Sequence, residues 1–200
     1  MARNRRHFRR PLGTRRYRKL FVLAVEGATT EPQYFALFND QHSVIHVDCV
    51  KGNHRSAPQQ VLKRMKIRLG EEGLSTSDEA WLVVDKDSWT EDQLDQLHAW
   101  SQERESYGLA LSNPKFEYWL LLHFENAKGI RTARDCRTRL KRHLPDYDKH
   151  IDRRMFPLVS IREAIARAQV RDNPPCKDWP RRTGTTVYRL VERLLGVSDG

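Results

Sequence analysis

Short apolar segments alternate with amphipathic segments from residue 19 to residue 124. Four segments, 20–25, 44–50, 80–84 and 109–112, are rich in apolar residues, and the first is apolar at every position, as in strands that are buried on both faces. Each is followed by turn residues and then by apolar side chains at helical spacing. Strands that alternate with helices in this way form βαβ units. The sequence therefore predicts an α/β fold with a doubly wound, mostly parallel sheet flanked by helices.

Residues that can cap helices follow the predicted strands. Thr29 or Thr30 precedes the first helical segment, Ser56 the second and Thr90 the third. Ser and Thr side chains accept hydrogen bonds from the free N–H groups of a first helical turn. We therefore expect helices to begin at these positions, and a fourth helix to cover residues 115–124.

The strand pattern ends near residue 125. Beyond it only helical spacing remains, interrupted by a Pro-rich loop at residues 173–180. We expect three parts: a flexible Arg-rich arm (residues 1–18), an α/β core (residues 19–125) and a basic helical extension packed on that core (residues 126–200).

The net charge of +10 is unevenly distributed along the chain. Residues 1–20 contain nine Arg and Lys and no acid, residues 21–125 contain more acids than bases, and residues 126–200 are again basic. This division excludes a uniformly basic, histone-like binder and predicts separate roles for the three segments.

Targeting and redox signals in the sequence are weak. The apolar runs are far shorter than the roughly 20 residues of a membrane helix, so we expect no membrane contact. No apolar stretch follows the basic start, so we expect no secretory signal. Cys49, Cys136 and Cys176 are widely spaced without a CxxC pair, which fits a reducing compartment and excludes a cysteine-based zinc site. We expect a cytoplasmic protein.

Both basic segments are candidates for binding nucleic-acid phosphates. In the extension, Arg131, Arg134 and Lys141 recur at helical spacing beside the apolar stripe, with Arg137 or Thr138 between them. A solvated helix face is the alternative explanation for this stripe. In the arm, the candidate residues are Arg5, Arg6, Arg9, Arg10, Arg15 and Arg16.

Carboxylates directly follow two of the predicted strands. Glu26 comes after the first strand, and Asp85 and Asp87 come after the third. Ligands of open parallel sheets bind at the carboxyl ends of the strands, and hard oxygen donors suit Mg²⁺ or Mn²⁺. Asp85 and Asp87 are therefore predicted metal ligands, and Glu26 a general acid or base, or a further ligand, for phosphodiester chemistry. Helix capping is the alternative, but the predicted threonine caps leave these acids without that role.

Five further polar or aromatic residues near these strand ends have two interpretations each. Glu117 is either a further metal ligand or a first-turn helix acid, and Glu31 is most simply a first-turn acid. Asn113 either orients a phosphate or, the favoured option, caps the helix that follows it. His123 is expected in the core rather than as a ligand. Trp89 either stacks on a base or packs on the next helix.

Four stretches of the chain resemble RloB-like proteins. They are residues 25–35 (VEGATTEPQYF), 84–89 (VDKDSW), 112–124 (SNPKFEYWLLLHF) and 184–191 (GTTVYRLV). The resemblance implies a Toprim-like fold with the metal-dependent phosphodiester chemistry of topoisomerases, primases and OLD-type nucleases. It also implies a place in bacterial restriction or phage-defence operons, often beside an ATPase subunit. By position, the Toprim glutamate corresponds to Glu26 and the DxD motif to Asp85 and Asp87.

Two functions from different classes fit these residues and the resemblance. The first is a Mg²⁺- or Mn²⁺-dependent Toprim-type nuclease that acts on DNA or RNA with an ATPase partner, using Glu26, Asp85, Asp87 and Glu117. The second is a non-catalytic nucleic-acid-binding adaptor that recruits or regulates an ATPase. Incidental contact of the basic arm with RNA is a third interpretation of the charge pattern alone.

Overall fold

The computed structural model describes residues 19–39, 45–50, 58–86 and 89–198. The predicted Arg-rich arm, with its six candidate arginines, lies outside these residues, as do Ser56 and Asp87.

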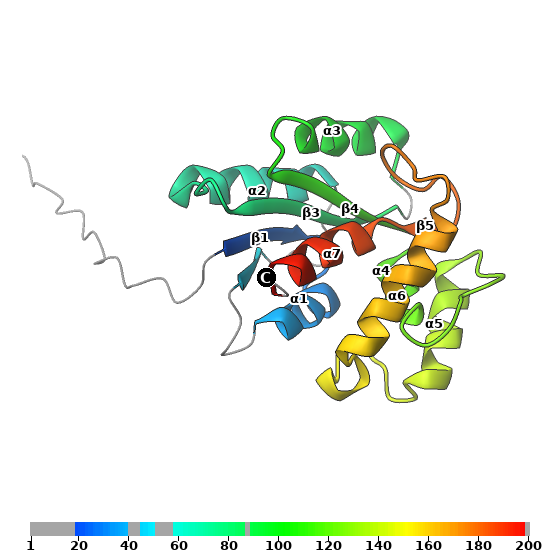
Figure 1. Ribbon diagram of the computed structural model, residues 1–200. Helices are drawn as coiled ribbons and strands as arrows, with labels where there is room; N and C mark the ends of the chain where they lie inside the picture. Colours follow the sequence, from blue (N-terminus) through cyan, green and yellow to red (C-terminus); the bar gives the residue numbers. More distant parts are fainter. Residues whose placement is uncertain (1–18, 40–44, 51–57, 87–88, 199–200) are drawn as a thin grey trace, which may run out of the picture.

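A five-stranded sheet forms the centre of the fold (Figure 1). Its strand order is β2-β1-β3-β4-β5; the first four strands are parallel and β5 is antiparallel to β4. This confirms the predicted α/β fold with a mostly parallel sheet. The strands are β1 (Lys19–Val25), β2 (Ile45–Val50), β3 (Glu79–Asp85), β4 (Tyr107–Asn113) and β5 (Gly184–Thr185).

Helices cover both faces of the sheet (Figure 1). One face carries α2 (Pro58–Glu72) and α3 (Glu91–Ser101), and the other carries α1 (Thr30–Phe35), α4 (Phe116–Leu121) and α7 (Val187–Ser198). Two more helices pack beside α4 and α7, and the described segments also include two 3-10 turns. They are α5 (Ala133–His143), α6 (Leu158–Arg171), η1 (Ala36–Phe38) and η2 (Arg153–Met155). Among the described residues, no helix has the length and apolarity needed to cross a membrane.

The two-sided cover explains why β1 is apolar at every position after Lys19. Phe21 and Leu23 belong to the core beneath α1 and α4, whereas Val22 and Ala24 belong to the core beneath α2 and α3. Since successive side chains of a strand point to opposite faces, a strand covered on both sides needs an unbroken apolar run.

The strand order creates a crevice between β1 and β3. The chain leaves β1 for α1 on one face of the sheet and leaves β3 for α3 on the opposite face. Helices that diverge in this way leave an opening at the carboxyl ends of the two strands, which is the usual ligand-binding position of open α/β sheets. Glu26 and Asp85 lie at this opening.

The chain beyond residue 126 contributes a strand to the sheet, and the expectation of helices alone in this region is wrong. Thr185 of β5 pairs with Ser112 of β4, and their hydroxyl oxygens lie 2.9 Å apart. The Thr186 N–H donates to the Leu111 carbonyl at 2.8 Å. A strand of two residues is too short to show any periodicity in the sequence.

An ionic cluster around the buried Glu79 carboxylate joins α7 to the amino ends of the strands. The Glu79 carboxylate accepts hydrogen bonds from Lys19 Nζ at 2.6 Å, from Arg193 Nη2 at 2.6 Å and from Trp81 Nε1 at 2.9 Å. Glu79 is buried, so these donors replace the water that its charge would otherwise need. The cluster lies at the edge of the sheet opposite to the crevice.

Candidate functional site

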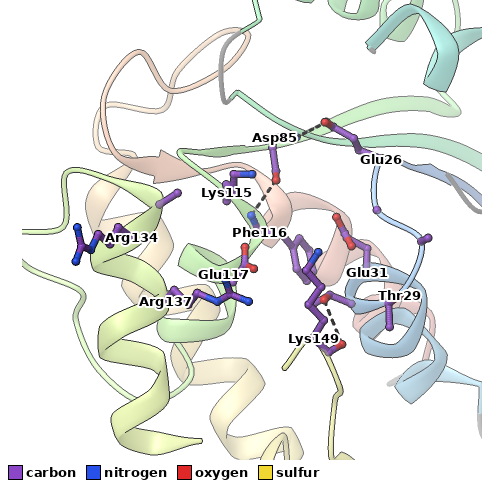
Figure 2. Close-up of a pocket in the computed structure, with 14 residues that line it drawn as sticks. Glu26, Thr29, Glu31, Asp85, Lys115, Phe116, Glu117, Arg134, Arg137 and Lys149 are labelled. Atoms are coloured by element: carbon purple, nitrogen blue, oxygen red, sulfur yellow. Dashed lines mark hydrogen bonds between the residues drawn. The ribbon is translucent and has the colours of Figure 1, made fainter. Parts of the chain in front are cut away.

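A cavity of about 540 Å³ lies at the carboxyl ends of β1 and β3 (Figure 2). Its walls come from the β1–α1 connection, the end of β3, the start of α4, and α5. Of the residues that the structure describes, eight charged ones line it, four of each sign. The carboxylates are Glu26, Glu31, Asp85 and Glu117, and the cations are Lys115, Arg134, Arg137 and Lys149.

Glu26 directly follows β1 and is half-buried. Its Oε2 atom accepts a hydrogen bond from the Asp85 backbone N–H at 3.1 Å, which ties the ends of β1 and β3 together. Burial and the nearby Glu31 carboxylate raise the pKa of Glu26 to about 7, while the hydrogen bond from Asp85 acts in the opposite direction. With this pKa, the protonated and the ionised form of Glu26 both occur near neutral pH.

Asp85 is the last residue of β3, and its carboxylate points to the α4 side of the sheet. Its Oδ1 atom accepts a hydrogen bond from the Phe116 backbone N–H at 2.8 Å, so it satisfies a free donor in the first turn of α4. Burial raises the pKa of Asp85 well above its usual range, and the charges of Glu31, Glu26 and Glu117 raise it further.

Glu31 belongs to the same site, although the sequence pattern indicated only a first-turn acid. It does lie in the first turn of α1, but that turn opens into the cavity and its side chain is buried. Burial, followed by the charge of Glu117, raises its pKa. A Cβ atom on Gly27 would overlap the Glu31 carboxylate, so Gly27 leaves room for this group. The signal in the sequence that could have identified Glu31 as a site residue is its position shortly after the Glu26–Gly27 turn.

Glu117 is the first-turn helix acid that one interpretation of the sequence gave, and a role as a metal ligand stays a prediction. It is an acid in the first turn of α4 and it also lines the cavity. The Tyr147 hydroxyl donates to Glu117 Oε1 at 3.5 Å. Its position beside Asp85 comes from the β4–α4 connection, which crosses the end of β3.

The capping expectations are only partly confirmed. Thr90 makes the predicted cap of α3, with a reciprocal hydrogen bond to Gln93, but Thr29 makes no side-chain hydrogen bond at the start of α1. The favoured interpretation of Asn113, as the cap of α4, is wrong. Its side-chain N–H donates to the Pro180 carbonyl at 3.0 Å instead. Asp85, distant in sequence, supplies the acceptor at that helix end instead.

The packing of His123 and Trp89 distinguishes between the two interpretations of each residue. His123 is buried in the core, as predicted, and its ring nitrogens lie 3.1 Å from the Tyr34 hydroxyl and 3.0 Å from the Trp119 carbonyl. Trp89 is half-buried against the core under α2 and α3, which favours packing over stacking on a base.

The predicted basic stripe is divided by the way α5 packs. Arg134 and Arg137 line the cavity, whereas Arg131 and Lys141 are exposed outside it. Lys149, which no pattern in the sequence singles out, is a further cation at the cavity. Its backbone carbonyl accepts a hydrogen bond from the Thr30 hydroxyl at 3.2 Å, which holds this segment against α1.

The site has donor atoms of the kind that hard divalent cations prefer, but the described side chains do not converge on one point. All four acidic side chains offer oxygen ligands, and their mutual repulsion contributes to the raised pKa values of Glu26 and Asp85. In the part of the chain that the structure describes, no three His, Cys, Asp or Glu side chains lie close enough together to hold a metal ion. Asp87, the third predicted ligand, lies outside that part.

A sequence profile described as RloB-like protein matches residues 21–194, which is nearly the whole chain. The chain belongs to the RloB-like protein family. No curated protein and no solved structure matches it. In this RloB-like protein, the stretches 25–35, 84–89 and 112–124 that carried the resemblance fall on the β1–α1 connection, the end of β3 and the β4–α4 connection. Each contributes acidic residues to the cavity.

Proposed function

We propose that this RloB-like protein is a Mg²⁺- or Mn²⁺-dependent nuclease with a Toprim-like fold, which cleaves phosphodiester bonds of DNA or RNA. The supporting observation is the cavity at the crevice between β1 and β3, which four carboxylates and four cations of the described residues line together. Carboxylates suit the metal, and Arg and Lys suit the phosphates of the substrate.

The proposal assigns different roles to the carboxylates. Asp85 and Asp87 hold the metal, with Glu26 as a further ligand or as the general acid or base. A metal ion bound there would polarise the phosphodiester and stabilise the leaving oxygen. The pKa of Glu26, about 7, suits proton exchange near neutral pH. Glu31 and Glu117 add negative charge to the same cavity.

The proposal also includes a partner protein. The resemblance to RloB-like proteins suggests action beside an ATPase subunit in a bacterial restriction or phage-defence system, so the ATPase belongs in the assay. Cleavage that requires this subunit would still support the nuclease assignment.

The proposal is tested with plasmid DNA, linear DNA and RNA, with Mg²⁺ or Mn²⁺, with and without the proposed ATPase partner. We expect nicking or degradation that Glu26→Gln and Asp85→Asn reduce by at least about a hundredfold. Asp95→Asn, at an exposed position of α3 outside the cavity, is the matched control and should retain activity. Absence of cleavage under all conditions would refute the enzyme assignment. Full activity of both site variants would refute the site assignment.

The non-catalytic adaptor is the second candidate, and one observation favours it. The carboxylates of Glu26 and Asp85 each accept a backbone hydrogen bond that holds a connection in place, so both have a structural role. An adaptor would retain nucleic-acid binding in Glu26→Gln and Asp85→Asn and lose it on deletion of residues 1–18. A nuclease would lose cleavage in the first two variants.

A further inference from the structure

Two arginines of the cavity lie apart from three of its carboxylates, with Lys115, Glu117 and Lys149 between the two groups (Figure 2). Glu26, Glu31 and Asp85 come from the sheet edge and α1, whereas Arg134 and Arg137 come from α5 on the other side. A phosphodiester placed between them would have carboxylates on one side and guanidinium groups on the other. Guanidinium groups bind phosphate oxygens through paired N–H donors.

The two arginines of the cavity wall are available to a ligand. Among the described residues, Arg134 makes no ion pair, and its side chain is exposed. Arg137 pairs with Asp148 at 3.6 Å, but both side chains are more than half exposed, so this pair contributes little to stability. Arg139 of the same helix differs, since it binds the Glu125 carboxylate and the Lys128 carbonyl. The helix therefore has a structural cation on one side and two accessible cations at the cavity.

Lys141 extends this accessible row away from the cavity. It lies seven positions after Arg134 on α5 and is exposed. Seven residues of α-helix span about 10.5 Å, a length over which a strand stacked at about 3.4 Å per nucleotide presents several phosphates. The row Arg134, Arg137 and Lys141 can therefore contact phosphates of one strand that runs towards the carboxylates.

The size of the cavity limits the form of the substrate. The space open to the centre of a water molecule is about 540 Å³, equal to a sphere about 10 Å across, which is narrower than a DNA duplex with its two backbones and its grooves of about 12 Å and about 6 Å. Glu31 is buried within the cavity, so a bound strand must enter to approach it. An intact duplex is too wide to enter such a recess as a whole, whereas a single strand or an extruded nucleotide can enter it.

We infer that the site takes a single, unpaired nucleic-acid strand, which enters along α5 with its phosphates on Arg134, Arg137 and Lys141. This inference rests on the proposed function, because the strand is the substrate of the carboxylate site. It specifies that this substrate is single-stranded and that it reaches the site along α5.

The test is equilibrium binding of short labelled oligonucleotides, measured by fluorescence anisotropy with Ca²⁺ in place of Mg²⁺. The probes are single-stranded DNA, single-stranded RNA and the DNA duplex of the same sequence. We expect tighter binding of at least one single strand than of the duplex. We expect the Arg134→Gln/Arg137→Gln variant to lose about tenfold or more in affinity for it, with a salt slope lower by about two.

Two controls separate charge at the cavity from charge in general. Arg142→Gln removes an exposed cation of α5 that does not line the cavity, and it should change the affinity by less than about twofold. Arg134→Lys/Arg137→Lys keeps the charge and should restore most of the binding. Circular dichroism of each variant checks that the helix content is unchanged.

The outcomes distinguish this inference from the proposed nuclease activity. Equal affinity for duplex and single strands, or equal effects of the Arg134→Gln/Arg137→Gln and Arg142→Gln changes, would overturn the inference while cleavage by the wild-type protein stands. Strand-selective binding that depends on Arg134 and Arg137, in a protein that cleaves nothing with Mg²⁺ or Mn²⁺, would support the binding path and refute the nuclease.

Discussion

Replacing His123 with Gln should change how the stability of the protein depends on pH. The His123 ring is buried between α1 and α4. Because the Trp119 carbonyl can only accept, Nδ1 must carry the proton, and Nε2 then accepts from the Tyr34 hydroxyl. The neutral ring is fully hydrogen-bonded in this arrangement. Burial lowers the pKa of His123 from 6.5 to about 4, since a charged ring would lose its water.

The size of the effect follows from the two pKa values. A folded-state pKa below the unfolded-state pKa means that the unfolded chain takes up the proton first. The neutral ring therefore contributes its full stability above about pH 6.5, and that contribution is lost as the pH falls towards 4. The complete loss is about 3 kcal/mol, of which about 2 kcal/mol is lost by about pH 5.

Urea unfolding of the wild type and of His123→Gln at several pH values measures this contribution. Carboxylates such as Glu26 titrate in both proteins, so they cancel when the two free energies of unfolding are subtracted. We expect the advantage of the wild type over the variant to shrink by about 2 kcal/mol between about pH 7 and about pH 5. A difference that stays constant over this range would refute a neutral, buried His123.

Three more predictions follow from other parts of the structure. Arg193→Met removes one partner of buried Glu79 and should lower the free energy of unfolding by about 1–2 kcal/mol. Urea unfolding measures the loss, with Arg142→Gln as the control variant. Equal stability of the two variants would contradict a stabilising role for this ion pair. Gly27→Ala places a Cβ against the Glu31 carboxylate, so it should lower the melting temperature, and Glu31→Ala in the same chain should recover part of the loss; no recovery would show another cause. Deleting residues 1–18 should weaken nucleic-acid binding more than the cleavage rate at saturating substrate, and the reverse pattern would show a catalytic role for the arm.

Local patterns were sufficient for most of the central fold. An unbroken apolar run predicted β1, and the turn residues after it placed Glu26 at the carboxyl end of a buried strand. The same reasoning placed Asp85 after β3 and His123 in the core. These predictions succeed because burial on both faces of a sheet imposes a composition that is visible within a few residues.

Other features depend on contacts between distant parts of the chain. Phe116 finds its capping acceptor in Asp85 rather than in neighbouring Asn113, because the start of α4 crosses the end of β3. Strand β5 exists because Thr185 pairs with β4, and a strand of two residues is too short to produce a periodic pattern in the sequence.

The sequence by itself determined the alternation of strands and helices, and thereby the edge of the sheet at which Glu26 and Asp85 lie. Only the tertiary structure decided that Glu31 joins them and that Arg134 and Arg137, but not Lys141, line the same cavity. The physical reason is that helical spacing defines a face of α5 or α1, whereas the packing of that helix on the rest of the protein decides what the face meets.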